Sequence, residues 1–196
     1  MPEIDPILRS DAELLGRCRD GDDRAFRRLV DRYHDALYAV AFGMLGAHSD
    51  SVSVVQDCFV RFYQNLEKFE GRSTLKTYLT RIVMNQALKQ IRQRQRWYYR
   101  FLSSDDPDIA VGESREESGI VGIEEEERAV RIRAAVQGLA PEFRSVVVLR
   151  FLNGCSTQEC STILKIPAGT VMSRLSRALD KLAPMLKDLN SQLPCP

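Results

Sequence analysis

The sequence lacks long apolar runs, histidine clusters and glycine-rich phosphate-binding loops. Although 44% of the 196 residues are hydrophobic, no stretch approaches the roughly 20 consecutive apolar residues that a membrane-spanning helix needs. The N-terminal segment is acidic and has neither the basic nor the apolar region of a signal peptide, so we expect a cytoplasmic protein. His34 and His48 are the only histidines, and neither belongs to a catalytic triad or a metal-binding motif. We therefore expect no enzyme activity, metal, cofactor or small-molecule substrate.

Cysteine is scarce and scattered along the chain. Of the five cysteines, only Cys155 and Cys160 lie close together. Their C-x4-C spacing, with no histidine nearby, is poor for zinc. We interpret the cysteines as reduced side chains that act as small apolar residues. A redox or metal-binding role for Cys155 and Cys160 is the less favoured alternative.

The net charge of +1 conceals an uneven distribution of charge. Residues 1–102 carry 17 basic and 13 acidic side chains, and residues 128–196 carry ten basic and four acidic ones. Residues 103–127 carry one basic and ten acidic side chains, and their Ser, Asp, Gly and Pro content is typical of a linker. Two basic modules are therefore expected on either side of an acidic tether.

Apolar residues outside this linker recur at three- and four-residue steps, without the alternation that is typical of strands. We predict an all-α fold with two small helical domains, an N-terminal helical bundle (1–102) and a C-terminal helix-turn-helix domain (128–196), joined by a flexible acidic linker (103–127). The acidic run 124–127 also suits the start of the next helix, because carboxylates stabilise helix N-termini. The predicted helices cover residues 11–18, 23–46, 51–67, 74–97, 125–138, 141–152, 156–164 and 168–189.

The fourth predicted helix and its flanks are basic and aromatic. Between Gly71 and Ser104 there is no acidic residue, but there are eight basic ones. A helical wheel places one set of residues on the inward face: Leu75, Leu79, Ile82, Val83 and Ala87. A second set forms a polar stripe: Tyr78, Arg81, Asn85, Lys89, Arg92 and Arg96. Cations neutralise phosphates, and rings, amides and guanidinium groups suit unstacked bases, so the stripe predicts a nucleic-acid interface.

This part of the chain resembles conserved region 2 of the extracytoplasmic-function sigma factors over roughly residues 20–96. The resemblance is carried by Val54-Val55-Gln56-Asp57-Cys58-Phe59, by Phe69-Glu70-Gly71-Arg72-Ser73 and by Tyr78-Leu79-Thr80-Arg81-Ile82-Val83-Met84-Asn85. It implies that the first motif binds RNA polymerase through Val55, Gln56, Asp57 and Phe59. It also implies that a base flipped from the −10 element is captured by Phe69, Arg81 and Asn85, with residues 70–77 as a specificity loop. The expected −10 contacts are Phe69, Arg72, Lys76, Tyr78, Arg81, Asn85, Lys89 and Arg92.

Two positions depart from the family pattern in this region. Val52 and Ser53 stand where the family usually has a carboxylate, which removes an acidic contact to polymerase. Tyr78 stands where tryptophan is common, and tyrosine can still stack on a base.

Residues 156–181 have the pattern of a helix-turn-helix. Ser156 and Glu159 predict a capping box, and Ile166-Pro167 ends the first of the two helices. The wheel directs four apolar residues of the second helix to the core: Val171, Leu175, Ala178 and Leu182. Its opposite face is polar and basic: Thr170, Ser173, Arg174, Arg177 and Lys181. Arginines on a helix of this kind can read guanine edges in a major groove.

The C-terminal module is similar to region 4 of the same family. The matching residues are Leu139-Ala140-Pro141, Arg144, Gly154, Ser156, Glu159, Leu164, Ile166-Pro167, Gly169-Thr170-Val171, Ser173-Arg174-Leu175 and Arg177-Ala178. The resemblance implies binding to the −35 element. The expected contacts are Thr170, Met172, Ser173, Arg174, Ser176, Arg177 and Lys181. Met172 replaces a frequent Lys or Arg, and Cys160-Ser161 replaces the usual apolar-Ala pair.

The predicted function is that of an alternative sigma factor, which binds core RNA polymerase and directs promoter recognition. The family resemblance also implies an anti-sigma factor, often membrane-anchored, as a further partner. Two alternatives stay open at this point. One is a dimeric helix-turn-helix regulator that acts without polymerase, and the other is an RNA-binding adaptor that uses residues 72–101.

Overall fold

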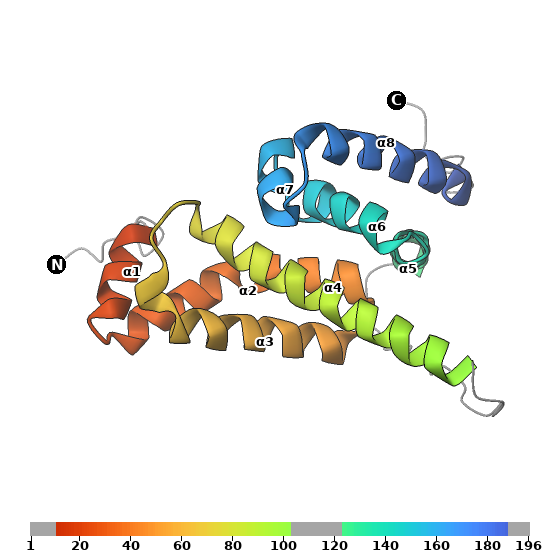
Figure 1. The fold of residues 1–196 in the computed structure, drawn as a ribbon. Coiled ribbons are helices and arrows are strands. Elements are labelled where there is room, and N and C mark those ends of the chain that lie inside the picture. Colours follow the sequence, from red (N-terminus) through yellow and green to blue (C-terminus); the bar gives the residue numbers. More distant parts are fainter. Residues whose placement is uncertain (1–10, 103–122, 188–196) are drawn as a thin grey trace.

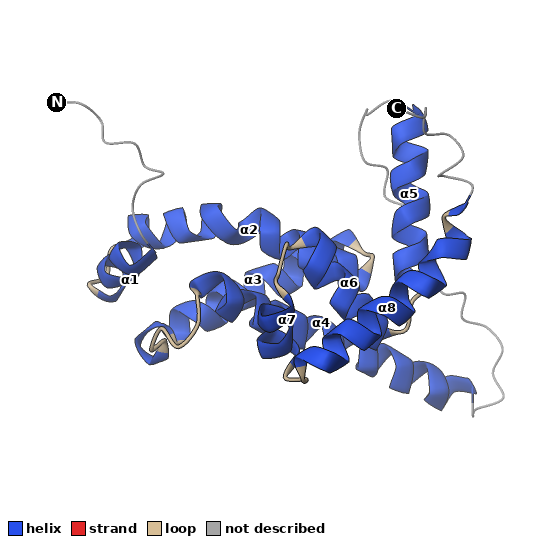
Figure 2. Ribbon diagram, turned by 90° about the horizontal axis from the view of Figure 1, so that it is seen from above, coloured by secondary structure: helices blue, strands red, loops and turns tan. Residues whose placement is uncertain are grey.

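The computed structural model describes residues 11–102 and 123–187, and within these ranges the chain is helical and has no strand (Figure 2). The N-terminal module holds α1 (Asp11–Arg19), α2 (Asp23–Leu45), α3 (His48–Gln64), the short 3-10 helix η2 (Leu66–Lys68) and α4 (Leu75–Leu102). The C-terminal module holds α5 (Ile123–Gln137), α6 (Pro141–Val147), the π-helical η3 (Val148–Leu152), α7 (Thr157–Leu164) and α8 (Ala168–Met185) (Figure 1). The all-α prediction is confirmed.

The boundaries differ from prediction at several ends. Helix α4 continues to Leu102 instead of residue 97, and the single helix expected over 141–152 is α6 followed by the π-helical η3. Helix α5 begins at Ile123, so residues 124–127 belong to it and not to the linker. Helix α8 ends at Met185, one residue after Pro184. Residues 103–122 of the predicted linker lie outside the described residues.

The N-terminal module is a bundle in which α2, α3 and α4 pack together. Asp22 caps α2, because its carboxylate accepts hydrogen bonds from the backbone N–H groups of Arg24 and Ala25. Gly46 ends α2 in the left-handed region with a φ of 72°, where a residue without a Cβ has no steric penalty. The residues that the wheel directed inward from α4 lie in or against the core: Leu75, Leu79, Ile82, Val83 and Ala87.

The C-terminal module is the predicted helix-turn-helix, with α8 packed on α6 and α7. The capping box of Ser156 and Glu159 is present at the start of α7. Lys165 ends α7 in the left-handed region, and Ser161 Oγ donates to the Ile166 carbonyl at 2.6 Å across the turn. This hydrogen bond gives a structural role to one of the two departures from the family pattern in α7.

The capping box gives a first prediction. Ser156→Ala should lower the free energy of unfolding by about 1 kcal/mol near neutral pH, because the Glu159 N–H loses its acceptor. The backbone N–H and the hydroxyl of Ser156 hold the pKa of Glu159 below its usual value. A depressed carboxyl pKa stabilises the fold above the unfolded pKa of about 4.3, and this contribution is lost as the pH falls through the folded pKa.

The effect of Ser156→Ala should therefore shrink in acid. Urea unfolding near pH 7 and below about pH 4 measures the loss of unfolding free energy in Ser156→Ala at each pH. Thr162→Ala is the matched control, because its exposed hydroxyl donates only to the Gln158 carbonyl within α7. Equal costs for the two variants at neutral pH would contradict the capping role.

The two modules are docked against each other and share one hydrophobic core. This core joins residues of α2 and α4 to Val148, Leu149, Cys155, Ile163 and others of the C-terminal module. In both ribbon views α6 and α7 lie beside α2 and α4 (Figure 1 and Figure 2). A Cβ on Gly43 of α2 would come within 2.7 Å of Leu152 Cδ1, so a glycine permits the close approach of η3. The sequence predicted two modules but not this contact.

Hydrogen bonds join the two modules at two places. Lys76 Nζ donates to the Asn153 carbonyl at 2.8 Å, and Asn153 Nδ2 donates to Thr80 Oγ1 at 3.1 Å. At the far end of α2, Gln137 Nε2 donates to the Gly43 carbonyl at 2.7 Å, and Arg144 Nη1 donates to the Met44 carbonyl at 2.7 Å. The last carbonyls of a helix lack partners within it and carry partial negative charge, so the C-terminal module supplies the donors that α2 lacks. Across the described ranges, no helix is both long and apolar enough to cross a membrane.

Candidate nucleic-acid interface

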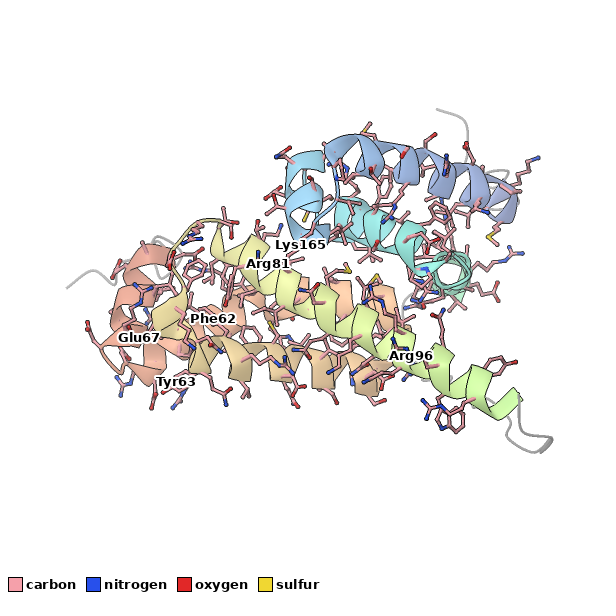
Figure 3. All side chains as sticks on the ribbon, in the orientation of Figure 1. Phe62, Tyr63, Glu67, Arg81, Arg96 and Lys165 are labelled. Atoms are coloured by element: carbon pink, nitrogen blue, oxygen red, sulfur yellow. The ribbon has the colours of Figure 1, made fainter. Side chains whose placement is uncertain are left out.

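The predicted polar stripe of α4 lies on the outside of the bundle. Asn85, Lys89, Arg92 and Arg96 are exposed, and Tyr78 and Arg81 are half-buried at the N-terminal end of the stripe. Figure 3 labels Arg81 and Arg96 on α4, with Phe62 and Tyr63 on the neighbouring α3. The stripe presents a ring, guanidinium groups, an amide and an ammonium group in one row, which suits phosphates and unstacked bases.

An aromatic cluster supports the start of this stripe. The ring of Tyr78 packs edge-on against Phe69 with centroids 4.9 Å apart, and both rings contact the fully buried Phe62. The Arg81 guanidinium lies over the Tyr78 ring, 5.5 Å from its centroid, which holds its planar group at the surface. The cluster therefore fixes the orientation of Tyr78 and Arg81.

The structure changes the role expected of Phe69. Its side chain is only 7% exposed and lies beneath Tyr78, while its carbonyl accepts a hydrogen bond from Arg19 at 2.6 Å. The ring therefore does not line an open base pocket in this structure. Its position identifies it as a supporting residue of Tyr78.

A groove of about 470 Å³ lies between α3 and α4, beside the stripe. Three expected −10 contacts line it, namely Tyr78, Asn85 and Lys89, whereas Phe69 and Arg81 do not. Five other lining residues were missed by sequence reasoning: Arg61, Asn65, Gln86, Gln90 and Gln93. The lining is completed by Ile82, which was expected on the inward face of the helix, and by Asp57, which was expected to contact polymerase. The amide side chains fall beside the stripe on the helical wheel, so a wheel drawn for α3 and α4 together could have found them.

Two of these amides have unused hydrogen-bonding capacity. Gln86 Nε2 and Gln90 Oε1 are buried atoms that have no partner among the described residues. A buried amide group without a partner costs free energy, so such groups favour any ligand that satisfies them. Donors and acceptors of this kind match the edges of bases.

The four expected polymerase contacts do not share one surface. Gln56 and Asp57 are exposed on α3, but Val55 and Phe59 are 1% and 7% exposed and lie in the core of the bundle. A helix turns by about 100° per residue, so adjacent residues of one motif point in different directions. Val55 and Phe59 are therefore not on the surface of the bundle in this structure, and their contact with polymerase stays a prediction. Gln56 and Asp57 stay proposed contacts.

Two expected phosphate contacts already have partners in the docked state. Arg72 forms an ion pair with Glu70 at 2.6 Å, and since both groups are exposed this pair contributes little. Lys76 donates to the Asn153 carbonyl of the C-terminal module. The ammonium group of Lys76 is thus held by the module interface while the modules are docked.

The second predicted nucleic-acid surface lies on α8. Val171, Ala178 and Leu182 are buried and Leu175 packs against the core, which confirms the predicted inward face. The expected contacts Met172, Ser173, Ser176, Arg177 and Lys181 are exposed, while Thr170 and Arg174 are half-buried. Met172 Sδ accepts a hydrogen bond from Thr157 Oγ1 at 3.6 Å, and Lys181 Nζ lies 5.8 Å from the centre of the Phe143 ring. Both positions are therefore anchored to neighbouring helices.

The chain matches two protein families in the order in which the modules occur. Residues 29–97 match Sigma-70 region 2, and residues 129–182 match Sigma-70, region 4. The chain is 32% identical over 184 residues to the ECF RNA polymerase sigma factor SigW of Bacillus subtilis, covering 89% of this chain and 96% of SigW. It is 30% identical over 191 residues to the ECF RNA polymerase sigma-E factor of Escherichia coli K12, covering 91% and 97%. The chain belongs to the extracytoplasmic-function (ECF) sigma factors.

Solved structures agree with this assignment. The chain resembles CnrH in its complex with the cytosolic domain of CnrY, with a TM-score of 0.66 and 26% identity over 91% of this chain and 97% of CnrH. It also resembles the sigma factor RpoE of Bartonella quintana in its complex with the anti-sigma factor NepR, with a TM-score of 0.64 and 25% identity over 83% and 96% of the two chains. This ECF sigma factor is an alternative sigma factor that directs promoter recognition and transcription initiation, and it is not an enzyme.

Proposed function

We propose that the outward stripe of α4 binds the −10 element and that the outward face of α8 binds the −35 element. The N-terminal module from α1 to α4 is the first DNA-binding domain, the C-terminal module from α5 to α8 is the second, and Gln56 and Asp57 on α3 contact core RNA polymerase. The observation that carries this proposal is the outward row from Tyr78 to Arg96, exposed from Asn85 onward, which lies beside an amide-lined groove. No carboxylate interrupts the sequence from Arg72 to Leu102, so the row attracts phosphates along its whole length.

The stripe of α4 suits a separated strand more than a duplex. A ring at Tyr78, a guanidinium group at Arg81 and an amide at Asn85 can stack on one unpaired base and hydrogen-bond to its edge. Unstacking a base costs a few kcal/mol. The sigma factor alone is therefore expected to melt DNA poorly, and binding to polymerase must supply part of this free energy.

Binding to both promoter elements requires the modules to separate. The element names place the two sites roughly 25 base pairs apart, which is about 85 Å of duplex at 3.4 Å per base pair. Helices α4 and α8, with 28 and 18 residues, are about 42 and 27 Å long, and both lie against α7 in the docked state. Their DNA-facing residues cannot reach both elements from this position. We therefore propose that the docked state is opened before transcription begins.

An anti-sigma factor is the partner that we propose for control of this opening. The solved relatives CnrH and RpoE were each found in a complex, with the cytosolic domain of CnrY and with the anti-sigma factor NepR. A cytoplasmic sigma factor held by a membrane-anchored anti-sigma factor would fit these complexes. This proposal concerns regulation and does not affect the assignment of the DNA-binding residues.

The assignment of α4 can be tested with Asn85→Ala. Loss of one amide contact to a base is worth about 1–3 kcal/mol, so run-off transcription from a cognate promoter should fall roughly 5- to 150-fold. Binding to core polymerase, measured by gel filtration or fluorescence anisotropy, should not change. The matched control is Gln95→Ala, because Gln95 is an exposed amide of α4 outside both the stripe and the groove.

The complementary variant is Gln56→Ala on α3. Here polymerase binding should weaken, and the fraction of transcription that is lost should be recovered at higher concentrations of the sigma factor. If Asn85→Ala weakened polymerase binding as much as Gln56→Ala does, the −10 assignment of the stripe would be wrong. Two-fold symmetric protection of DNA by the isolated chain would instead support a dimeric regulator.

A further inference from the structure

Two cysteines lie together at the junction of the modules. Cys155 precedes α7 and is 3% exposed, and Cys160 lies in the second turn of α7 and is fully buried. Both belong to the core that the two modules share. The Cys160 thiol also lies 4.0 Å from the Cys155 carbonyl, which it faces. The promoter-binding function uses neither side chain.

The surroundings of the two sulfur atoms are unequal. Asn153 Nδ2 donates to Cys155 Sγ at 3.6 Å, and the Cys160 thiol faces the backbone carbonyl of the same residue. The neighbouring Cys160 thiol, assisted by Lys76 and Asn153, lowers the pKa of Cys155, while the Cys155 sulfur and burial raise the pKa of Cys160. Cys155 is therefore the thiolate-forming member of the pair, and Cys160 is the thiol beside it.

The other described cysteines lack this chemistry. Cys58 is fully buried between α3 and α4, its thiol donates to the Leu79 carbonyl at 3.6 Å, and burial raises its pKa to about 12. Burial and the nearby Asp22 raise the pKa of Cys18. Neither has a second cysteine as a hydrogen-bond partner among the described residues. These two residues serve as internal references for thiol reactivity.

Helix α4 of the N-terminal module closes the pair off from solvent. Asn153, which contacts Cys155, is itself bonded to Thr80 of α4 through its side chain and to Lys76 of α4 through its carbonyl. When the modules separate, these contacts break and the shared core that contains the pair is opened to solvent. Access to the pair thus depends on the same opening that promoter binding requires.

We propose that Cys155 and Cys160 form a thiol pair that a low-molecular-weight disulfide oxidises to an intramolecular disulfide, and that module docking controls the rate. The Cys155 thiolate attacks the reagent disulfide, which forms a mixed disulfide and releases one reagent thiolate. Cys160 then attacks the Cys155 sulfur, and its proton passes to the second reagent thiolate as that group leaves. The protein loses two electrons and two protons, and one reagent disulfide becomes two thiols.

The reaction can be followed on a single peptide. Trypsin cleaves after Arg150 and Lys165, so peptide 151–165 contains both cysteines of the pair and no other cysteine. The full chain carrying Cys195→Ser is incubated with oxidised glutathione, alkylated and digested without reduction. Mass spectrometry should find the peptide with two hydrogen atoms fewer and unalkylated. In Cys160→Ser the same peptide should instead accumulate one glutathione on Cys155.

Gly43→Val tests the control by docking. Its side chain would collide with Leu152 and Val148 of η3, neither of which is a cysteine of the pair, and should wedge the modules apart. The matched control is Gly16→Val, because a Cβ on Gly16 of α1 meets nothing within 4 Å. Thr80→Val provides a milder opening variant, since it removes the oxygen that accepts from Asn153. Circular dichroism confirms that each variant keeps its helices.

We expect the disulfide to form at least tenfold faster in Gly43→Val than in the wild type and Gly16→Val, with Thr80→Val between them. Cys18 and Cys58 should stay unmodified over the same period. Peptide 151–165 that remains a dithiol in Gly43→Val, or that carries only mixed disulfides, would refute the thiol pair. Equal rates in all four proteins would refute control by docking.

Discussion

Replacing Phe62 by alanine is expected to lower the free energy of unfolding by about 3–5 kcal/mol, the range for deletion of a large buried aromatic side chain. Phe62 is fully buried in α3, and its ring lies 6.1–6.3 Å from the ring centres of Phe26, Phe69 and Tyr78. Removing it leaves a cavity beneath the aromatic cluster, which rigid helices around it can fill only in part. Urea unfolding followed by circular dichroism measures the change.

Removal of the Phe62 ring should also disturb the DNA-binding surface. Tyr78 and Phe69 rest on Phe62, so a cavity there lets the first residue of the α4 stripe move. Transcription by Phe62→Ala should fall even at a temperature where the variant is fully folded. The matched control is Tyr63→Ala, since Tyr63 is the next residue, is 51% exposed and meets the ring of Phe26 in a T-shaped contact. A cost for Tyr63→Ala above about 1 kcal/mol, or one equal to that of Phe62→Ala, would contradict this view of the core.

Local patterns predicted the helices and their faces because a helix has 3.6 residues per turn and buries one apolar face in the core. The inward faces of α4 and α8 follow directly from the spacing of residues such as Leu79 and Val83, or Val171 and Ala178. The predicted ends of the helices were less accurate than their faces. Helix α4 carries no glycine or proline from Leu75 to Leu102, so no local signal separates an end at residue 97 from one at residue 102.

Motif matching proposed contact residues but did not indicate which of them reach the surface. Val55, Phe59 and Phe69 lie in matching motifs, yet each is buried. For α3 the spacing of Val55, Phe59 and Phe62 already indicates one inward face. Of the four expected polymerase contacts, Gln56 and Asp57 fall outside this face. Because a helix turns by about 100° per residue, the spacing of its apolar residues indicates better than the motif which side chains reach the surface.

Docking of the modules could not be predicted from local sequence. Its polar contacts join residues far apart in the chain, such as Lys76 with Asn153 and Gln137 with Gly43. None of these residues predicts an interface contact by itself, because a lysine, an amide or a glycine occurs in many structural settings. The apolar run Val148-Leu149 of η3 is buried, but its sequence does not identify the helix that covers it. Only the three-dimensional arrangement identifies the interface.

Arg144→Leu is expected to cost about 3 kcal/mol of stability and to open the docked modules. The Arg144 guanidinium is partly buried, which lowers its pKa, and it donates to the Met44 carbonyl, to Gln137 Oε1 and to the carbonyls of Gln137 and Leu139. Hydrogen bonds from charged donors contribute about 1.5–3 kcal/mol each, and buried carbonyls left without donors add a penalty. The last turn of α2 contains no basic residue, so Arg144 supplies the positive charge at that helix end.

Two readouts separate the local effect from the effect on docking. Urea unfolding measures stability, and small-angle X-ray scattering measures the radius of gyration of the folded chain, which should increase as the modules part. Arg144→Lys keeps the charge but cannot reach several carbonyls at once, so its stability should lie between those of the wild type and Arg144→Leu. Arg133→Leu removes the same charge from an exposed position on α5 and is the matched control. An Arg144→Leu chain as compact as the wild type would mean that the Met44 contact contributes nothing to docking, and that apolar packing against Gly43 holds the modules together.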